Sequence, residues 1–144
     1  MSEHRTGTGP TYTIYIIEIM PLWHELVAPD LPEGKRCFYV GQTSHDVSVR
    51  YREHLTGTSA GGRKPKTTVR ALKPIFKAKG SVPLQRNHDV TLRRTMMADY
   101  PQLTELSEAE DLESKVVDDL RALGHCVYPK KLGSIEFQAY KQCD

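Results

Sequence analysis

The chain has 144 residues, 38% hydrophobic and 26% charged, which is enough for one buried core but hardly for two. No apolar run approaches the roughly 18 residues that cross a bilayer, and the N-terminus lacks the order of a signal peptide, so we expect a cytoplasmic protein that does not bind membranes. Three cysteines without CxxC or CxxH spacing, Cys37, Cys126 and Cys143, indicate neither a disulfide framework nor a zinc site but reduced thiols.

The charges are unevenly distributed, although the net charge is only +2. Residues 60–100 contain ten Lys or Arg against two acidic residues, a local charge of +8, and both flanks are acidic. This pattern predicts a local anion-binding surface. The alternative is a solvated lysine-rich face that binds nothing.

The N-terminal third predicts two strands joined by a long connection. Residues 1–10 are polar and rich in glycine and proline, which is typical of a flexible leader. Residues 11–19, TYTIYIIEI, are rich in β-branched and aromatic side chains and predict a buried strand. Residues 20–37 contain three prolines and one glycine, and loops of this length are often functional. FYVG, residues 38–41, predicts a second short strand.

Residues 44–57, SHDVSVRYREHLTG, predict a short helix. Ser44 and Asp46 are both candidates for its N-cap, because their side chains can accept a hydrogen bond from a free backbone N–H. Gly57 is expected to end the helix.

The basic middle of the chain predicts a loop, a helix and a strand in succession. Residues 58–66 have the composition of a mobile basic loop. Residues 67–80 predict a helix that is interrupted or kinked at Pro74. Residues 87–95, NHDVTLRRT, predict a third strand.

Residues 106–125 give the clearest helical pattern, opened by a capping box of Ser107 and Glu110 and closed at Gly124. On a wheel of about 100° per residue, Glu113 points into the apolar stripe of this helix. The stripe consists of Leu106, Ala109, Leu112, Val116, Val117, Leu120 and Leu123. An unpaired carboxylate that faces the core is costly, so Glu113 is expected to be ion-paired, protonated or bound to a metal.

Glu113 and four other candidate functional residues, Tyr15, Tyr39, Arg50 and His54, also have ordinary structural explanations when each is considered alone. Glu113 would be a buried carboxylate paired with an arginine. Tyr15 and Tyr39 would be packing residues in strands, and Arg50 and His54, at i and i+4 of one helix, would be a surface pair. Their order along the chain is more informative than any one of them.

The segments TIYII, YVGQTS, RYREH and LESKVV follow one another in this order. Through them, residues 11–125 resemble the GIY-YIG nuclease family. The resemblance implies a small α/β (α+β) domain over residues 11–128, with a three-stranded antiparallel sheet flanked by helices, and leaves 129–144 as a C-terminal extension. It also implies metal-dependent hydrolysis of a nucleic-acid phosphodiester.

The resemblance implies an active site of five residues. Glu113 would hold one Mg²⁺ or Mn²⁺ ion, a hard cation that prefers carboxylate and water ligands. Arg50 would offer a planar fork to the phosphate. Tyr15 would face the attacking water and pass its proton to His54, because a free phenol is a poor base near neutrality. Tyr39 would orient water or phosphate.

The expected substrate is double-stranded DNA, held through its phosphates by basic residues from the middle of the chain. These residues are Arg63, Lys64, Lys66, Arg70, Lys73 and Lys77. Sequence specificity would come from the long connection, the basic region, or a homodimer or partner subunit. The alternatives are a noncatalytic nucleic-acid-binding module and a nuclease subunit that is active only with a partner protein.

Three features depart from the family pattern. Thr13 stands where the first glycine is expected, and the connection between the two motif strands is long. The family has an asparagine after the last helix, whereas Asn87, the only asparagine of this chain, precedes Glu113. His125 falls near the expected position and is a candidate replacement, although a surface histidine at a helix end is the alternative reading.

Overall fold

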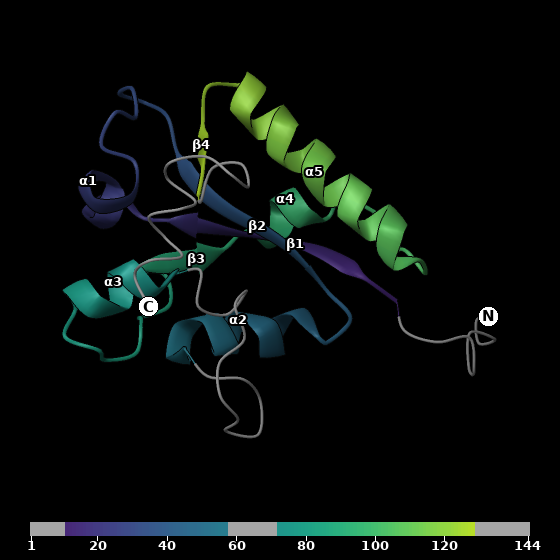
Figure 1. The fold of residues 1–144 in the computed structure, drawn as a ribbon, viewed down its shortest axis with the longest axis horizontal. Helices are drawn as coiled ribbons and strands as arrows, with labels where there is room; N and C mark the ends of the chain where they lie inside the picture. The colour runs from purple at the N-terminus through teal and green to yellow at the C-terminus, as the bar shows by residue number, and fades with distance from the viewer. Residues whose placement is uncertain (1–10, 58–71, 129–144) are drawn as a thin grey trace.

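The computed structural model describes residues 11–57 and 72–128, which form a mixed sheet with helices on both sides (Figure 1). Strand β1 (Thr13–Ile19) lies in the centre and pairs antiparallel with β2 (Cys37–Thr43) and β3 (Val90–Leu92). Strand β4 (Cys126–Val127) pairs parallel with β2, so the strand order is β3-β1-β2-β4.

The α+β class is confirmed, but the expected three-stranded antiparallel sheet is wrong, because β4 adds a fourth, parallel strand. After the last helix the chain returns along the outer edge of β2. There the backbone N–H groups of Cys126 and Tyr128 donate to the carbonyls of Arg36 and Phe38, at 2.9 and 2.8 Å. Pairing of this edge satisfies backbone groups that would otherwise be free.

Helices cover both faces of the sheet. Helix α5 (Leu106–Ala122) lies over one face, and α2 (Val47–Thr56) and α3 (Lys73–Ala78) lie on the other (Figure 1). Because β1 is covered on both faces, its residues 14–19 are all buried, which explains why it reads as a nearly continuous apolar run.

The long connection after β1 is partly helical. It contains a 3-10 turn, η2 (Pro21–Trp23), and the short helix α1 (His24–Val27). The indole Nε1 of Trp23 donates to the carboxylate of Asp89 at 2.8 Å, which ties the connection to the segment before β3. A second short helix, α4 (Arg94–Met97), follows β3.

Helix α2 begins and ends as its sequence predicts. Asp46 rather than Ser44 is its N-cap, since the carboxylate of Asp46 accepts a hydrogen bond from the backbone N–H of Ser48 at 2.8 Å. Gly57 ends the helix with a φ of +77°, a conformation that favours glycine.

The capping box predicted for α5 is wrong. The helix begins at Leu106, and its N-cap Glu105 makes no side-chain capping bond. Ser107 therefore already lies inside the first turn, where its side chain cannot act as an N-cap. The predicted end is confirmed, because Gly124 follows the helix with a φ of +93°.

The interruption or kink predicted at Pro74 cannot be followed, because residues 67–71 of the predicted helix lie outside the described residues. Helix α3 begins at Lys73, so Pro74 lies in the first turn, where its missing N–H breaks no helical hydrogen bond. The leader 1–10, the basic segment 58–71 and the extension 129–144 lie outside the described residues. None of the described helices is long and apolar enough to cross a membrane.

Candidate active site

Three of the predicted site residues form a buried aromatic cluster. The hydroxyl of Tyr15 on β1 lies 2.9 Å from Nε2 of His54 on α2, and both side chains are almost completely buried. The ring of Tyr39 on β2 lies 5.0 Å from the His54 ring and 6.1 Å from the Tyr15 ring, measured between centroids. Residues from β1, β2 and α2 are thus brought together as the motif order predicts.

Gly41 makes room for Tyr15. The two residues are directly paired across β1 and β2, and a Cβ atom on Gly41 would lie 2.5 Å from both Cζ and the hydroxyl oxygen of Tyr15. Sequence reasoning assigned no physical role to Gly41. A glycine inside a strand often marks such a close approach, so the signal was present in the sequence.

Arg50 lies one turn before His54 on α2, and it is 9% exposed. Its Nη1 is 3.1 Å from a carboxylate oxygen of Glu53, close enough for an ion pair. The contact lacks hydrogen-bond geometry, and within the described residues neither Nη1 nor Nε of Arg50 has an acceptor. A buried guanidinium with unsatisfied N–H groups is well suited to bind an anion. Glu53 is a member of the site that sequence reasoning missed.

The hydroxyl of Tyr15 is a neutral phenol in this setting. Burial raises its pKa well above the ordinary value, and the neighbouring Tyr39 raises it further. The positive charge of Arg50 acts in the opposite direction and lowers the pKa. Tyr15 can therefore take up a proton from water only if its own proton moves elsewhere, and His54 is the adjacent acceptor.

Glu113 stands apart from the aromatic cluster but within its electrostatic range, because its charge also raises the pKa of Tyr15. It is half-buried on α5, as the helical wheel predicts. Burial, with a smaller effect from Glu110, raises its own pKa to about 7. No basic side chain among the described residues forms an ion pair with it, so the glutamate–arginine pair considered for Glu113 is not found there.

Glu113 is the only carboxylate predicted to bind the metal, and the described residues contain no group of three His, Cys, Asp or Glu side chains that could hold an ion. A single partly buried carboxylate without a cation partner still fits the ordinary chemistry of Mg²⁺. That ion commonly takes one or two protein carboxylates and fills its other positions with water and phosphate oxygens.

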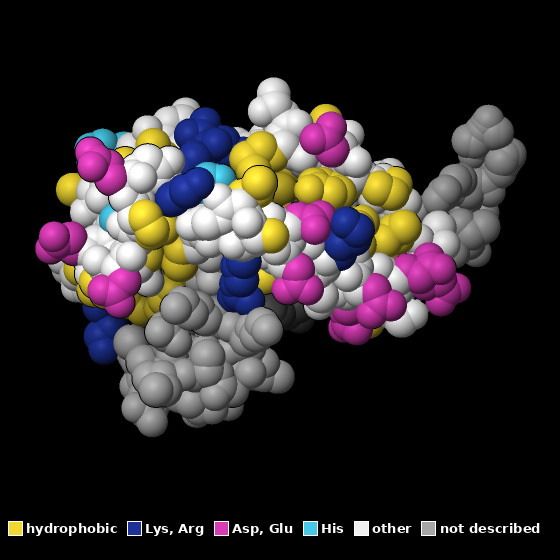
Figure 2. Space-filling model, turned by 90° about the horizontal axis from the view of Figure 1, so that it is seen from above, with side chains coloured by type: hydrophobic (Ala, Val, Ile, Leu, Met, Phe, Trp, Pro, Cys, Tyr) yellow, Lys and Arg dark blue, Asp and Glu magenta, His cyan; other side chains and the backbone are white. Residues whose placement is uncertain are grey.

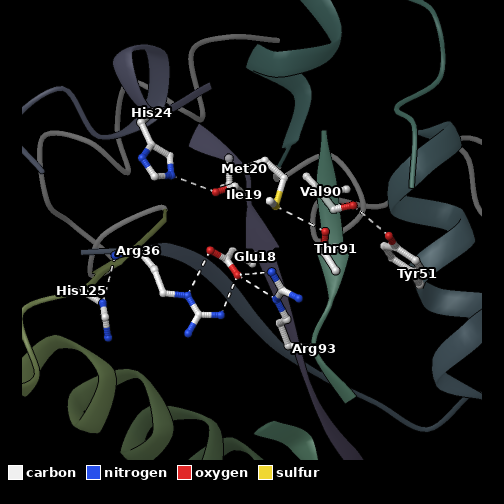
Figure 3. Close-up of polar contacts among 10 residues, drawn as sticks. All are labelled: Glu18, Ile19, Met20, His24, Arg36, Tyr51, Val90, Thr91, Arg93 and His125. Atoms are coloured by element: carbon white, nitrogen blue, oxygen red, sulfur yellow. Dashed lines mark hydrogen bonds and ion pairs between the residues drawn. The ribbon is translucent and has the colours of Figure 1, made fainter. Parts of the chain in front are cut away.

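Besides the Arg50–Glu53 pair, a buried glutamate contacts arginines at Glu18, on the β1 face that α5 covers (Figure 3). Arg36 donates two hydrogen bonds to this carboxylate, at 2.7 and 3.1 Å, and Arg93 donates from the other side at 2.7 Å. Burial alone would raise the pKa of Glu18, but the two arginines lower it. Sequence reasoning assigned no partner to Glu18.

His125 lies beside this ion cluster (Figure 3). Its Nδ1 accepts a hydrogen bond from the backbone N–H of Arg36 at 3.0 Å, and its ring packs edge-on against Phe38, with centroids 5.5 Å apart. Both contacts fasten the end of α5 to the start of β2. They fit the reading of His125 as a helix-ending histidine better than a role in place of the family asparagine.

An open hollow of about 450 Å³ lies at the N-terminal end of α2. Its lining includes Thr13, Asp46, Arg94 and Gln102, and none of the five predicted site residues. Thr13, in the place of the first family glycine, accepts a hydrogen bond from the Gln102 amide at 3.0 Å. The hollow is therefore not part of the aromatic cluster.

Of the six residues predicted to bind DNA, Arg63, Lys64, Lys66 and Arg70 lie outside the described residues, and Lys73 and Lys77 belong to α3. Helix α3 lies on the same side of the sheet as α2. The face seen from the α5 side instead carries many acidic side chains along the helix (Figure 2). Lys73 and Lys77 thus belong to the side of the sheet opposite this acidic face.

Searches of protein-family models, curated proteins and solved structures found no match to this chain.

Proposed function

We propose that the protein is a GIY-YIG-type endonuclease that hydrolyses DNA phosphodiester bonds with one divalent metal ion. One observation carries the proposal: the buried hydrogen bond between Tyr15 and His54 lies beside Arg50, whose buried Nε and Nη1 lack acceptors among the described residues. A proton-accepting pair next to a guanidinium with N–H groups that lack hydrogen-bond acceptors suits the hydrolysis of an anionic ester.

Arg50 binds the scissile phosphate. Its planar fork matches two phosphate oxygens, and it is held in place on α2 next to Glu53. The same charge favours the transition state, in which negative charge on the phosphoryl oxygens increases. Burial of Arg50 strengthens this interaction, because little water competes for its N–H groups.

Tyr15 and His54 move the proton of the attacking water. Tyr15 accepts that proton as its own hydroxyl proton passes to Nε2 of His54, across the 2.9 Å contact. The two transfers have to be coupled, because burial disfavours a free phenolate at Tyr15. Tyr39, packed against the His54 ring, fixes the orientation of this pair.

Glu113 would hold the Mg²⁺ or Mn²⁺ ion. When bound, such an ion supplies positive charge to the phosphate and lowers the pKa of a coordinated water. Glu113 is suited to this role, since its half-buried carboxylate lacks a basic partner in the described part of the chain.

The proposed substrate is double-stranded DNA, approached from the α2 and α3 side. A noncatalytic nucleic-acid-binding module would share the basic residues, but it would have no need for the buried pair of Tyr15 and His54. The same site would also serve a nuclease subunit that cleaves DNA only together with a partner protein.

Cleavage of supercoiled plasmid tests the proposal. With Mg²⁺ the wild-type protein should nick or linearise the plasmid, and a chelator should stop it. Tyr15→Phe should cleave at least ~100-fold more slowly, because it removes the hydroxyl that relays the proton. Tyr39→Phe should cause a smaller loss.

Tyr51→Phe is the matched control. Tyr51, on α2, is also a buried tyrosine. Its hydroxyl donates a hydrogen bond to the carbonyl of Val90 at 2.9 Å and takes no part in the aromatic cluster. Loss of this hydrogen bond in Tyr51→Phe should cost about 1 kcal/mol of stability and leave cleavage near the wild-type rate. Wild-type protein that binds plasmid but leaves it intact with Mg²⁺ and Mn²⁺ would favour the noncatalytic module. A wild-type rate for Tyr15→Phe would exclude Tyr15 as the proton acceptor.

A further inference from the structure

Two cysteines that are distant in the sequence are neighbours in the sheet. Cys37 begins β2, Cys126 begins β4, and the two residues are direct partners in the parallel pairing of these strands. Their thiols share a hydrogen bond. Cys37 is completely buried, whereas Cys126 is partly exposed.

The placement of the pair is compatible with a covalent bond. Neighbouring strands lie about 4.8 Å apart, so paired Cα atoms fall within the range of roughly 4.4 to 6.8 Å that disulfides span. Directly paired residues also project to the same face of a sheet, which brings the two sulfur atoms together.

We propose that Cys37 and Cys126 form a reversible intramolecular disulfide when the protein meets a small-molecule disulfide such as oxidised glutathione. The thiolate of Cys126 attacks one sulfur of the oxidant, which forms a mixed disulfide and releases one glutathione thiolate. The thiolate of Cys37 then attacks the sulfur of Cys126 and releases the second. Two protein thiols are oxidised, one glutathione disulfide is reduced to two thiols, and the protein thiol protons go to solvent and the released thiolates.

The environments of the two thiols set this order. Cys126 attacks first because it is the partly exposed residue of the pair, whereas Cys37 is completely buried. The hydrogen bond with Cys126, together with burial, raises the pKa of the Cys37 thiol. Modification of Cys126 alters that hydrogen bond, so Cys37 becomes easier to ionise at the second step.

The bond would strengthen a weak part of the fold. Strand β4 has only two residues, and it pairs the chain that follows α5 with the edge of β2. A disulfide here closes a loop of about 90 residues, the kind of long loop whose closure restricts the unfolded chain most. This inference does not depend on the proposed nuclease function.

Oxidation of the folded wild-type protein and of Cys143→Ser with a glutathione redox buffer tests the proposal. The Cys143→Ser protein should become lighter by two hydrogen atoms and lose two alkylatable thiols, and peptide mapping without reductant should link Cys37 to Cys126. Hydrogen exchange at the amides of Cys126 and Tyr128, which pair with β2, should slow by ~10-fold or more. Reductant should reverse each change.

Cys126→Ser in the same background is the control, and its exchange rates should not respond to the oxidant. Because Cys126 is only partly buried, this variant should fold. The peptide map is made on proteins that retain both Cys37 and Cys126, so it does not depend on the folding of this variant. Glutathione that stays attached to Cys126 while Cys37 remains reduced would overturn the proposal. So would a map in which wild-type Cys126 links to Cys143 instead of Cys37.

Discussion

Replacing Glu113 by glutamine is expected to stabilise the folded protein above pH 7 while abolishing DNA cleavage. The pKa of Glu113 is about 7 in the folded protein, against an ordinary value of 4.5. The folded state therefore binds more protons than the unfolded state between these values, so stability falls as the pH rises from about 4.5 to about 7. This difference in pKa would lower the free energy of unfolding by about 3 kcal/mol for a fully buried group, and by about 1 to 2 kcal/mol for the half-buried Glu113.

Urea unfolding at pH 5 and at pH 8 measures this effect. Glu113→Gln should exceed the wild type at pH 8 and match it more closely at pH 5. Magnesium should raise the thermal midpoint of the wild type at pH 8 but not that of the variant, because only an ionised carboxylate binds the ion. Asp118→Asn, an exposed change on the same helix, should alter neither stability nor cleavage. A Glu113→Gln protein that is less stable than the wild type at pH 8 would contradict the inference that the ionised carboxylate of Glu113 destabilises the folded protein.

Gly41→Ala is expected to destabilise the protein by about 1 to 3 kcal/mol and to reduce cleavage by ~100-fold. Elsewhere in a strand, replacing glycine by alanine would be mildly stabilising, since glycine loses the most conformational freedom on folding. Here the new methyl group would lie 2.5 Å from the phenol of Tyr15, so the ring must shift and its hydrogen bond with His54 must lengthen.

A double-mutant cycle with Tyr15→Leu isolates this clash. Leucine lacks the Cζ and hydroxyl atoms that the new methyl group meets, so Gly41→Ala should cost little or even stabilise the protein in that background. Stability is measured by urea unfolding of the four proteins. An equal cost of Gly41→Ala in both backgrounds would mean that the close approach to Tyr15 is not its cause.

The elements that could be predicted from sequence are those with a local physical signal. The strand β1 was visible as an apolar run because helices bury both of its faces, and α2 was visible through Asp46 and Gly57 at its ends. The half-buried position of Glu113 followed from helix periodicity alone. Motif order brought Tyr15 and His54 together correctly, although they come from different elements.

What the sequence did not reveal depends on contacts between distant segments. Strand β4 is two residues long, too short for any periodicity, and exists because β2 offers a free edge. Glu18 reads as a polar interruption of a strand until Arg36 and Arg93 are placed around it. The helical wheel could show that Glu113 faces the core side of its helix, but not which glutamates would contact an arginine.

The two faces of β1 carry incompatible kinds of side chain, which constrains how this strand can change over evolutionary time. Tyr15 points toward the aromatic rings and Glu18 toward two arginines, because their positions differ by an odd number of residues. Substitutions that preserve size can be absorbed on either face. An insertion or deletion of one residue between them would bring the carboxylate to the side of the rings and leave both arginines without their partner. Length variation in relatives of this chain should therefore collect in the connection after Met20 and be absent from β1.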